Sequence, residues 1–110
     1  MEGNRMIEET IKKRIKEIFE KGKVEISRII LFGSRARGDW RKDSDWDILI
    51  VVNKELTRDE KIEFSHLIRK KLAEELIPCD VLIKSEKEVE ERKKVIGSII
   101  RTAIKEGIVL

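Results

Sequence analysis

The fold is decided by two short stretches of sequence, LFGS at residues 31–34 and DWDILIVV at residues 45–52. In the first stretch an apolar run ends at a glycine, which allows a tight turn where the backbone approaches a ligand closely. In the second stretch Asp45 and Asp47 open another apolar run. Because side chains alternate along a strand, we expect both carboxylates on one face and Trp46 on the other. The sequence therefore predicts a glycine turn that faces a pair of carboxylates.

Hydrophobic patterning around these stretches predicts a small sheet backed by helices. Five consecutive apolar residues at 48–52 indicate a strand that is buried on both faces, and hence central in the sheet. Shorter apolar runs at 29–32 and 80–83 predict the strands that precede and follow it. The element order is helix, strand, turn, strand, helix, strand, helix. This order places the chain in the α/β or α+β class.

Helix starts are marked by spacing and by polar caps. Apolar residues recur at helical intervals over residues 7–19, which predicts the first helix. Thr57 with Glu60, and Ser85 with Glu88, have the spacing of capping boxes. Each pair precedes an apolar periodic segment, so we expect one helix to follow each of them.

The extent and packing of these helices are also predicted. The helix after residue 57 is expected to bury the apolar residues Ile62, Phe64, Leu67, Ile68, Leu72 and Leu76. We expect the last helix to run without a break to Gly107, with Gly97 inside it at a cost of about 1 kcal/mol. Between the first two strands, Ser34 is expected to act as the N-cap of a short helical turn.

Composition limits the class of protein. A chain of 110 residues is expected to form a single domain over 1–110, and 43% of its residues are charged, against roughly 25% in typical soluble domains. Its net charge of +3 is small for a nucleic-acid binder. It has no apolar run of membrane-spanning length, and Cys79 alone makes neither a disulfide framework nor a Cys-rich zinc site. We expect a cytoplasmic protein that binds neither membrane nor nucleic acid.

A third carboxylate joins the candidate site. Asp80 begins the last predicted strand, and if this strand neighbours the one that begins at Asp45, the three carboxylates of Asp45, Asp47 and Asp80 converge at one place. Carboxylates that lie within a few ångströms of one another repel unless a cation neutralises them. Mg²⁺ suits such oxygen ligands and bridges them to substrate phosphates. The pattern predicts a metal site for phosphoryl chemistry, in which two ions can flank the phosphoryl group.

The turn at Gly33 and Ser34 fits the same chemistry. Backbone N–H groups at the start of a helical turn can hold phosphate oxygens, and the Ser34 hydroxyl adds a donor. Four cationic residues follow the turn: Arg35, Arg37, Arg41 and Lys42. Of these, Arg35 and Arg37 are predicted to contact the nucleotide phosphates.

These residues resemble a known signature. Gly33-Ser34, ten intervening residues and then Asp45-Trp46-Asp47 match the pattern of the DNA polymerase beta-like nucleotidyltransferase superfamily, and Asp80 stands where that family has its third metal ligand. The resemblance covers residues 26–83 and is greatest to the minimal nucleotidyltransferases. It implies a short mixed sheet flanked by helices, with the Gly-Ser turn at the end of the first strand.

The resemblance also implies an activity. Asp45 and Asp47 would bind two Mg²⁺ ions and orient the α-phosphate of ATP. Asp80 would hold the catalytic metal and help to deprotonate the acceptor, while Gly33 and Ser34 would bind the outer phosphates. Many minimal nucleotidyltransferases are antitoxins paired with a HEPN-domain toxin. The implied reaction is transfer of AMP to a hydroxyl, that of a tyrosine, on such a toxin within a hetero-oligomer.

Two alternatives remain open at this point. The chain could be a binding module that neutralises its partner by occlusion, without catalysis. It could also be a nucleotidyltransferase that acts on a small molecule or an RNA end, although the modest net charge argues against RNA.

Overall fold

The computed structural model describes residues 2–39, 41 and 44–110, so Lys42 lies outside the described residues. The helices and strands are α1 (Glu2–Lys21), β1 (Ile26–Phe32), α2 (Ser34–Arg37), β2 (Trp46–Val52), α3 (Arg58–Glu74), β3 (Cys79–Ser85), α4 (Glu86–Arg92), α5 (Ile99–Glu106) and β4 (Ile108–Val109). Among the described residues, no helix has the length and apolarity that a bilayer crossing requires.

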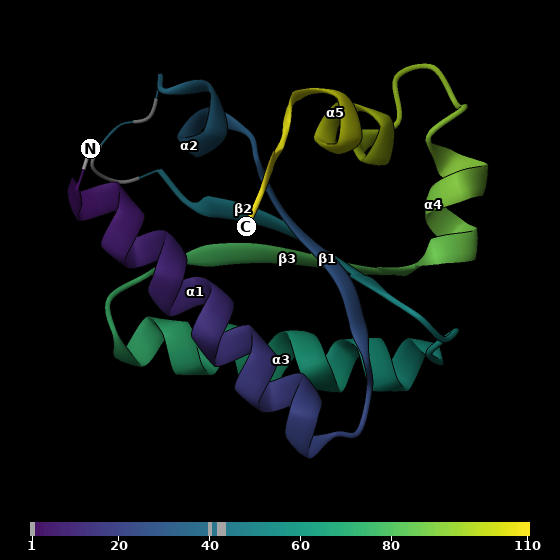
Figure 1. Cartoon of the computed structure of the whole chain (residues 1–110), viewed down its shortest axis with the longest axis horizontal. Helices are drawn as coiled ribbons and strands as arrows, with labels where there is room; N and C mark the ends of the chain where they lie inside the picture. The colour runs from purple at the N-terminus through teal and green to yellow at the C-terminus, as the bar shows by residue number, and fades with distance from the viewer. Residues whose placement is uncertain (1, 40, 42–43) are drawn as a thin grey trace.

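The strands form one mixed sheet in the order β3-β2-β1-β4. β1 runs antiparallel to both β2 and β4, whereas β2 and β3 run parallel. Helices α1 and α3 cover one face of the sheet, and α4 and α5 lie on the other (Figure 1). The predicted fold class, a small mixed sheet flanked by helices, is confirmed.

The second strand is buried on both faces, as its sequence predicts. All side chains from Ile48 to Val52 are fully buried. Ile48, Ile50 and Val52 pack in the core beneath α1 and α3, while the alternate residues pack beneath α4 and α5. Burial of one such side chain contributes about 1.5–3 kcal/mol, so this short run joins two hydrophobic cores into one stable unit.

Both predicted capping boxes are present. The Thr57 hydroxyl accepts from the Glu60 amide at 3.1 Å, and the Glu60 carboxylate accepts from the Thr57 amide at 2.9 Å. Ser85 and Glu88 make the same reciprocal pair at the start of α4, each bond at 3.1 Å. Local hydrogen bonding of this kind depends only on spacing, which is why the sequence predicts these helix starts.

The prediction of an unbroken last helix is wrong. The segment divides into α4 and α5, with Gly97 between them in a left-handed conformation, φ 82°. Ser98 then acts as the N-cap of α5 and accepts a hydrogen bond from the Arg101 amide. Glycine adopts this conformation without strain, and a serine immediately after it offers a new cap, so two helices replace one. The short strand β4 after Gly107 was also not predicted.

The predicted buried face of α3 is too broad. Ile68 and Leu72 are fully buried, and Phe64 stacks on Phe19 with the ring centroids 4.4 Å apart. These three α3 positions recur every four residues and form a single stripe. The other predicted core residues fall outside this stripe and are exposed: Ile62 at 55%, Leu67 at 43% and Leu76 at 90%.

Candidate active site

Two of the three predicted aspartates lie side by side across the sheet. Strand register pairs Asp47 of β2 with Asp80 of β3 on one side and with Phe32 of β1 on the other. Asp45 lies just before β2, which begins at Trp46 and not at the predicted Asp45. The site is thus built where β1 ends and where β2 and β3 begin.

Trp46 and Asp47 lie on opposite faces of the sheet, as predicted. Trp46 is 2% exposed and packs in the core beneath α1 and α3. Asp47 has the opposite orientation, because side chains alternate along the strand. On that face the apolar row of Leu49 and Val51 ends at Asp47. The carboxylate therefore marks the point where the second core gives way to a polar site.

The glycine turn packs directly against this carboxylate. Gly33 has φ 74° and ψ −157°, a conformation that side-chain-bearing residues almost never adopt. A Cβ atom at this position would lie only 2.1 Å from Oδ2 of Asp47. Glycine at position 33 is therefore required both by the backbone conformation and by the neighbouring carboxylate.

The prediction that Ser34 is an N-cap is wrong. Gly33, which has no side chain to cap the helix, occupies the N-cap position of α2, and Ser34 is the first helical residue. The Gly33 carbonyl accepts from the amides of Ala36 and Arg37 at 3.1 and 3.0 Å. The first amide groups of such a helix have no acceptor within it. Of these groups, the amide of Ser34 lies next to Gly33.

The surroundings of Asp47 disfavour its charged form. Partial burial raises the pKa of its carboxyl above the ordinary value of 3.8, and the negative charges of Asp80 and Asp45 raise it further. The positive charge of Arg37 opposes this increase in the pKa. Ionised Asp47 is thus a half-buried anion beside other anions, a state that a bound cation would relieve.

The donor set fits a hydrated Mg²⁺ ion. As the side chains stand, no three His, Cys, Asp or Glu residues in the described part of the chain are gathered closely enough to hold a metal. Mg²⁺, however, typically takes one or two carboxylates and completes its shell with water and substrate phosphates. Asp47 and Asp80 supply such a pair. Asp45 is exposed next to them, where its side chain can rotate.

The two predicted phosphate-contacting arginines have different surroundings. Arg35 donates to the Ser44 carbonyl from Nε at 3.2 Å and from Nη2 at 2.9 Å, and its guanidinium lies 4.7 Å from the centre of the Trp46 ring. Arg37 is exposed and pairs with Asp39 at 3.4 Å. Arg35 thus holds the segment that leads into Asp45, while Arg37 contributes charge near Asp47.

Alanine substitutions should separate these two roles. We expect Arg35→Ala to lower the free energy of unfolding by about 1–2 kcal/mol, because it removes hydrogen bonds and a cation–π contact. Arg37→Ala should change stability by less than about 0.5 kcal/mol but weaken binding of an anionic probe such as ATP about tenfold, more at low salt than at high salt. Urea denaturation and ATP titration at two salt concentrations measure both effects. Equal effects of the two substitutions on stability and on ATP binding would contradict these separate roles.

Sequence reasoning missed one residue of the site, Arg69. It projects from α3, and its Nη2 atom lies 3.5 Å from Oδ1 of Asp80. Nothing in the helical pattern marks Arg69 among the many cationic residues of α3. Its place depends on how α3 packs on β3, which only the tertiary structure specifies.

The raised pKa of Asp47 predicts a pH-dependent stability. Well below pH 3.8 the carboxyl is protonated in both the folded and the unfolded chain, so its ionisation does not affect the free energy of unfolding. Above that pH the unfolded chain ionises first, and the penalty on the folded state grows until the pH passes the raised pKa of Asp47. We therefore expect Asp47→Asn, without divalent ions, to gain stability relative to the wild type as pH rises through this window. Denaturation in EDTA across pH measures the difference, and a pH-independent difference would contradict it.

Comparison with known proteins agrees with this geometry. The sequence pattern of the nucleotidyltransferase domain family matches residues 9–110. The chain belongs to this family. This nucleotidyltransferase is 36% identical, over 105 residues, to a protein of Methanocaldococcus jannaschii named "putative protein adenylyltransferase". The match covers 94% of the chain and 96% of that protein.

Solved structures share the fold of this nucleotidyltransferase. A toxin–antitoxin complex with AMP-PNP matches with a TM-score of 0.58 at 18% identity, over 88% of this chain and 69% of that one. A Sulfolobus solfataricus protein described as a "putative nucleotidyltransferase" matches with a TM-score of 0.54 at 26% identity, over 92% and 82% of the two chains.

Proposed function

We propose that this nucleotidyltransferase is a Mg²⁺-dependent protein adenylyltransferase that transfers AMP from ATP to a hydroxyl of a partner protein. The row formed by Gly33, Asp47 and Asp80 carries the proposal, because it sets the backbone of a glycine turn directly against two neighbouring carboxylates. Further support comes from the relative named as a protein adenylyltransferase, which matches nearly the whole chain.

Each residue has a part in the proposed reaction. The acceptor oxygen attacks the α-phosphorus of ATP, the bond to the β-phosphate oxygen breaks, and pyrophosphate leaves. Asp80 takes the proton of the acceptor hydroxyl. Gly33 lets the backbone of the turn approach the carboxylates closely, and the amide and hydroxyl of Ser34 donate to the outer phosphates. Arg37 balances their charge.

Two Mg²⁺ ions, held by Asp45, Asp47 and Asp80, complete the proposed site. When bound, they neutralise the carboxylates and stabilise charge on the phosphates of the transition state. Partial burial of Asp47 strengthens this effect, since a charge in a less polar environment interacts more strongly with a cation.

The proposed partner is a HEPN-domain toxin, modified on a tyrosine, with the chain acting as its antitoxin. A solved toxin–antitoxin complex has this fold, which supports a toxin as the partner. The side chain of Asp80 is 62% exposed, and Asp45 is exposed as well. Because these carboxylates are open to solvent, the site is suited to a macromolecule that supplies the acceptor hydroxyl and covers the site.

The test is transfer of label from ATP labelled at the α-phosphate. The purified chain, Mg²⁺ and the protein encoded beside it are incubated together, and labelled protein and released pyrophosphate are measured. We expect the partner to be labelled in equal amount to the pyrophosphate. Asp45→Asn with Asp47→Asn should abolish labelling, while Asp59→Asn, an exposed aspartate at the start of α3, should not.

The outcomes separate the two main alternatives. If the double Asn variant still protects cells and still co-purifies with its partner, the chain neutralises by occlusion. Labelling of a small molecule or of RNA in place of the protein would show a different acceptor. No labelled product with the wild type would overturn the proposal.

A further inference from the structure

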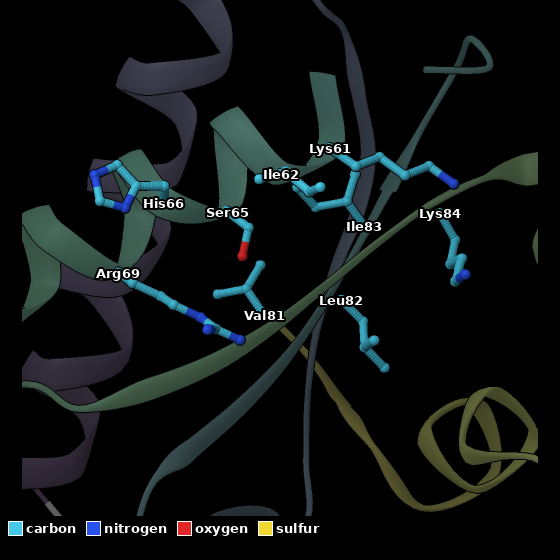
Figure 2. Close-up of a pocket in the computed structure, with 9 residues that line it drawn as sticks. All are labelled: Lys61, Ile62, Ser65, His66, Arg69, Val81, Leu82, Ile83 and Lys84. Atoms are coloured by element: carbon cyan, nitrogen blue, oxygen red, sulfur yellow. The ribbon is translucent and has the colours of Figure 1, made fainter. Parts of the chain in front are cut away.

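A groove runs along the open edge of the sheet, on the far side of β3 from β2. It has a volume of about 450 Å³ and lies between α3 and residues 81–84 of β3 (Figure 2). Across the described residues, no strand pairs with this outer edge, since β3 stands at the end of the strand order. An edge strand presents a row of N–H and C=O groups that an extended peptide can pair with.

The lining of the groove is cationic. Lys61, His66 and Arg69 of α3 and Lys84 of β3 contribute to it, and none of the described residues that line it is acidic. Lys61 and Lys84 share one carboxylate, Glu88, at 2.8 and 3.8 Å. Arg69 makes a longer contact with Asp80, at 3.5 Å. The three permanent cations, Lys61, Lys84 and Arg69, are thus paired with two carboxylates, Glu88 and Asp80. The positive charge that is not neutralised favours an acidic occupant.

The same charges disfavour a second copy of this chain as the occupant. Antiparallel pairing of two β3 edges about a two-fold axis perpendicular to the sheet would place both α3 helices on the same face of the joined sheet. Lys61, His66 and Arg69 of one copy would then face the same cations of the other. Lysine on an edge strand also discourages unspecific pairing, so the edge is selective for negative charge.

We propose that this groove binds an extended acidic segment of the partner protein as an added strand and places a hydroxyl side chain of that segment beside Asp80. This inference rests on the proposed function and identifies the acceptor as a strand-forming peptide. The partner's side chain opposite Asp80 would be the one that receives AMP.

Strand geometry determines which side chains meet. Asp80, Leu82 and Lys84 alternate with Val81 and Ile83, so they lie on the same face of the sheet as Asp47. Directly opposed residues of paired strands have Cβ atoms about 4.5–5.5 Å apart. A serine, threonine or tyrosine opposite Asp80 would thus bring its hydroxyl next to the site.

The neighbours of that hydroxyl residue would point the other way, toward α3. There they meet Arg69 and His66, which line the groove (Figure 2). Acidic side chains on both sides of the acceptor residue would therefore suit the groove. Such a side chain would give Arg69 a new partner in place of Asp80, whose carboxylate would be released for the metal.

The test uses labelled peptides of about eight residues, the length that pairs along a strand such as β3. In one peptide glutamate alternates with valine around a central tyrosine, and in the other lysine replaces glutamate. Binding is measured by fluorescence anisotropy without nucleotide, and hydrogen exchange reports the protection of β3 amides. We expect the acidic peptide alone to bind and to slow exchange in β3.

Charge-reversing variants locate the binding. Arg69→Glu with Lys61→Glu should weaken binding of the acidic peptide at least tenfold, whereas Lys70→Glu, on the exposed side of the same helix, should change it less than twofold. Arg69→Ala with Lys61→Ala provides a milder pair, should the reversed variant fail to fold. Equal binding of both peptides, unchanged exchange in β3, or a dimer formed through β3 would overturn the proposal.

Failure of this proposal is distinguishable from failure of the proposed function. If the partner is labelled with ATP and the groove variants leave the KM for the partner unchanged, the groove proposal is wrong and the transferase stands. If the acidic peptide binds and protects β3 but the wild type labels no protein, the groove stands and the transferase proposal is wrong.

Discussion

Gly33→Ala is expected to abolish transfer of AMP while leaving most of the fold intact. The added Cβ would lie 2.1 Å from Oδ2 of Asp47, so either the turn or the carboxylate must move. A displacement of about 1 Å in a catalytic group can cost about 100-fold in rate. The strained conformation should also lower the free energy of unfolding by about 1–3 kcal/mol. Transfer rates and urea denaturation measure the two effects.

Gly38 provides the matched control for this prediction. It also has a positive φ, 88°, but a Cβ there would meet none of the described residues within 4 Å. Gly38→Ala should therefore lose about 1–2 kcal/mol of stability from backbone strain and keep most of its activity. Equal losses of activity in both variants would mean that strain in the backbone, and not contact with Asp47, explains the requirement for glycine.

Asp47→Asn is expected to reduce transfer at least about 100-fold, because charge stabilisation by a bound metal supplies several kcal/mol to the transition state. The same substitution should remove the response of stability to Mg²⁺ and ATP. A ligand at 100 times its Kd stabilises a protein by about 2.7 kcal/mol. Thermal denaturation with and without Mg²⁺ and ATP should show this shift for the wild type and none for the variant.

Asp39→Asn is the control for this substitution. Asp39 is exposed and pairs only with Arg37 among the ion pairs of the described residues. The variant should keep both activity and the Mg²⁺ response. A wild-type shift that persists in Asp47→Asn would place the metal elsewhere.

The parts of the fold that could be predicted from sequence depend on local pattern. The central position of β2 follows from five consecutive apolar residues, and the starts of α3 and α4 follow from capping boxes at fixed spacing. The break at Gly97 could not be predicted, because a glycine within a helical pattern costs only about 1 kcal/mol. Whether the chain continues or turns there depends on tertiary packing. A strand as short as β4 has too few residues to form a pattern.

The candidate site also has features that could be predicted from the sequence and features that could not. Asp47 and Asp80 could be placed near the starts of two predicted strands, but the parallel pairing that sets them side by side appears only in the structure. The contact of Arg35 with the Ser44 carbonyl could not be predicted, since a backbone acceptor has no signature in the sequence. The approach of Arg69 to Asp80 depends on the packing of α3 against β3. Long-range contacts of this kind appear only once the elements are assembled.

The most direct test of the account is paramagnetic relaxation by Mn²⁺, added in place of Mg²⁺ together with a non-hydrolysable ATP analogue. The central claim is that Asp45, Asp47 and Asp80 hold the metal beside Gly33. We predict that amide signals of Gly33, Asp47 and Asp80 broaden first, and that Asp45→Asn with Asp47→Asn removes this broadening. Selective broadening elsewhere in the chain, or none at these residues, would contradict the claim.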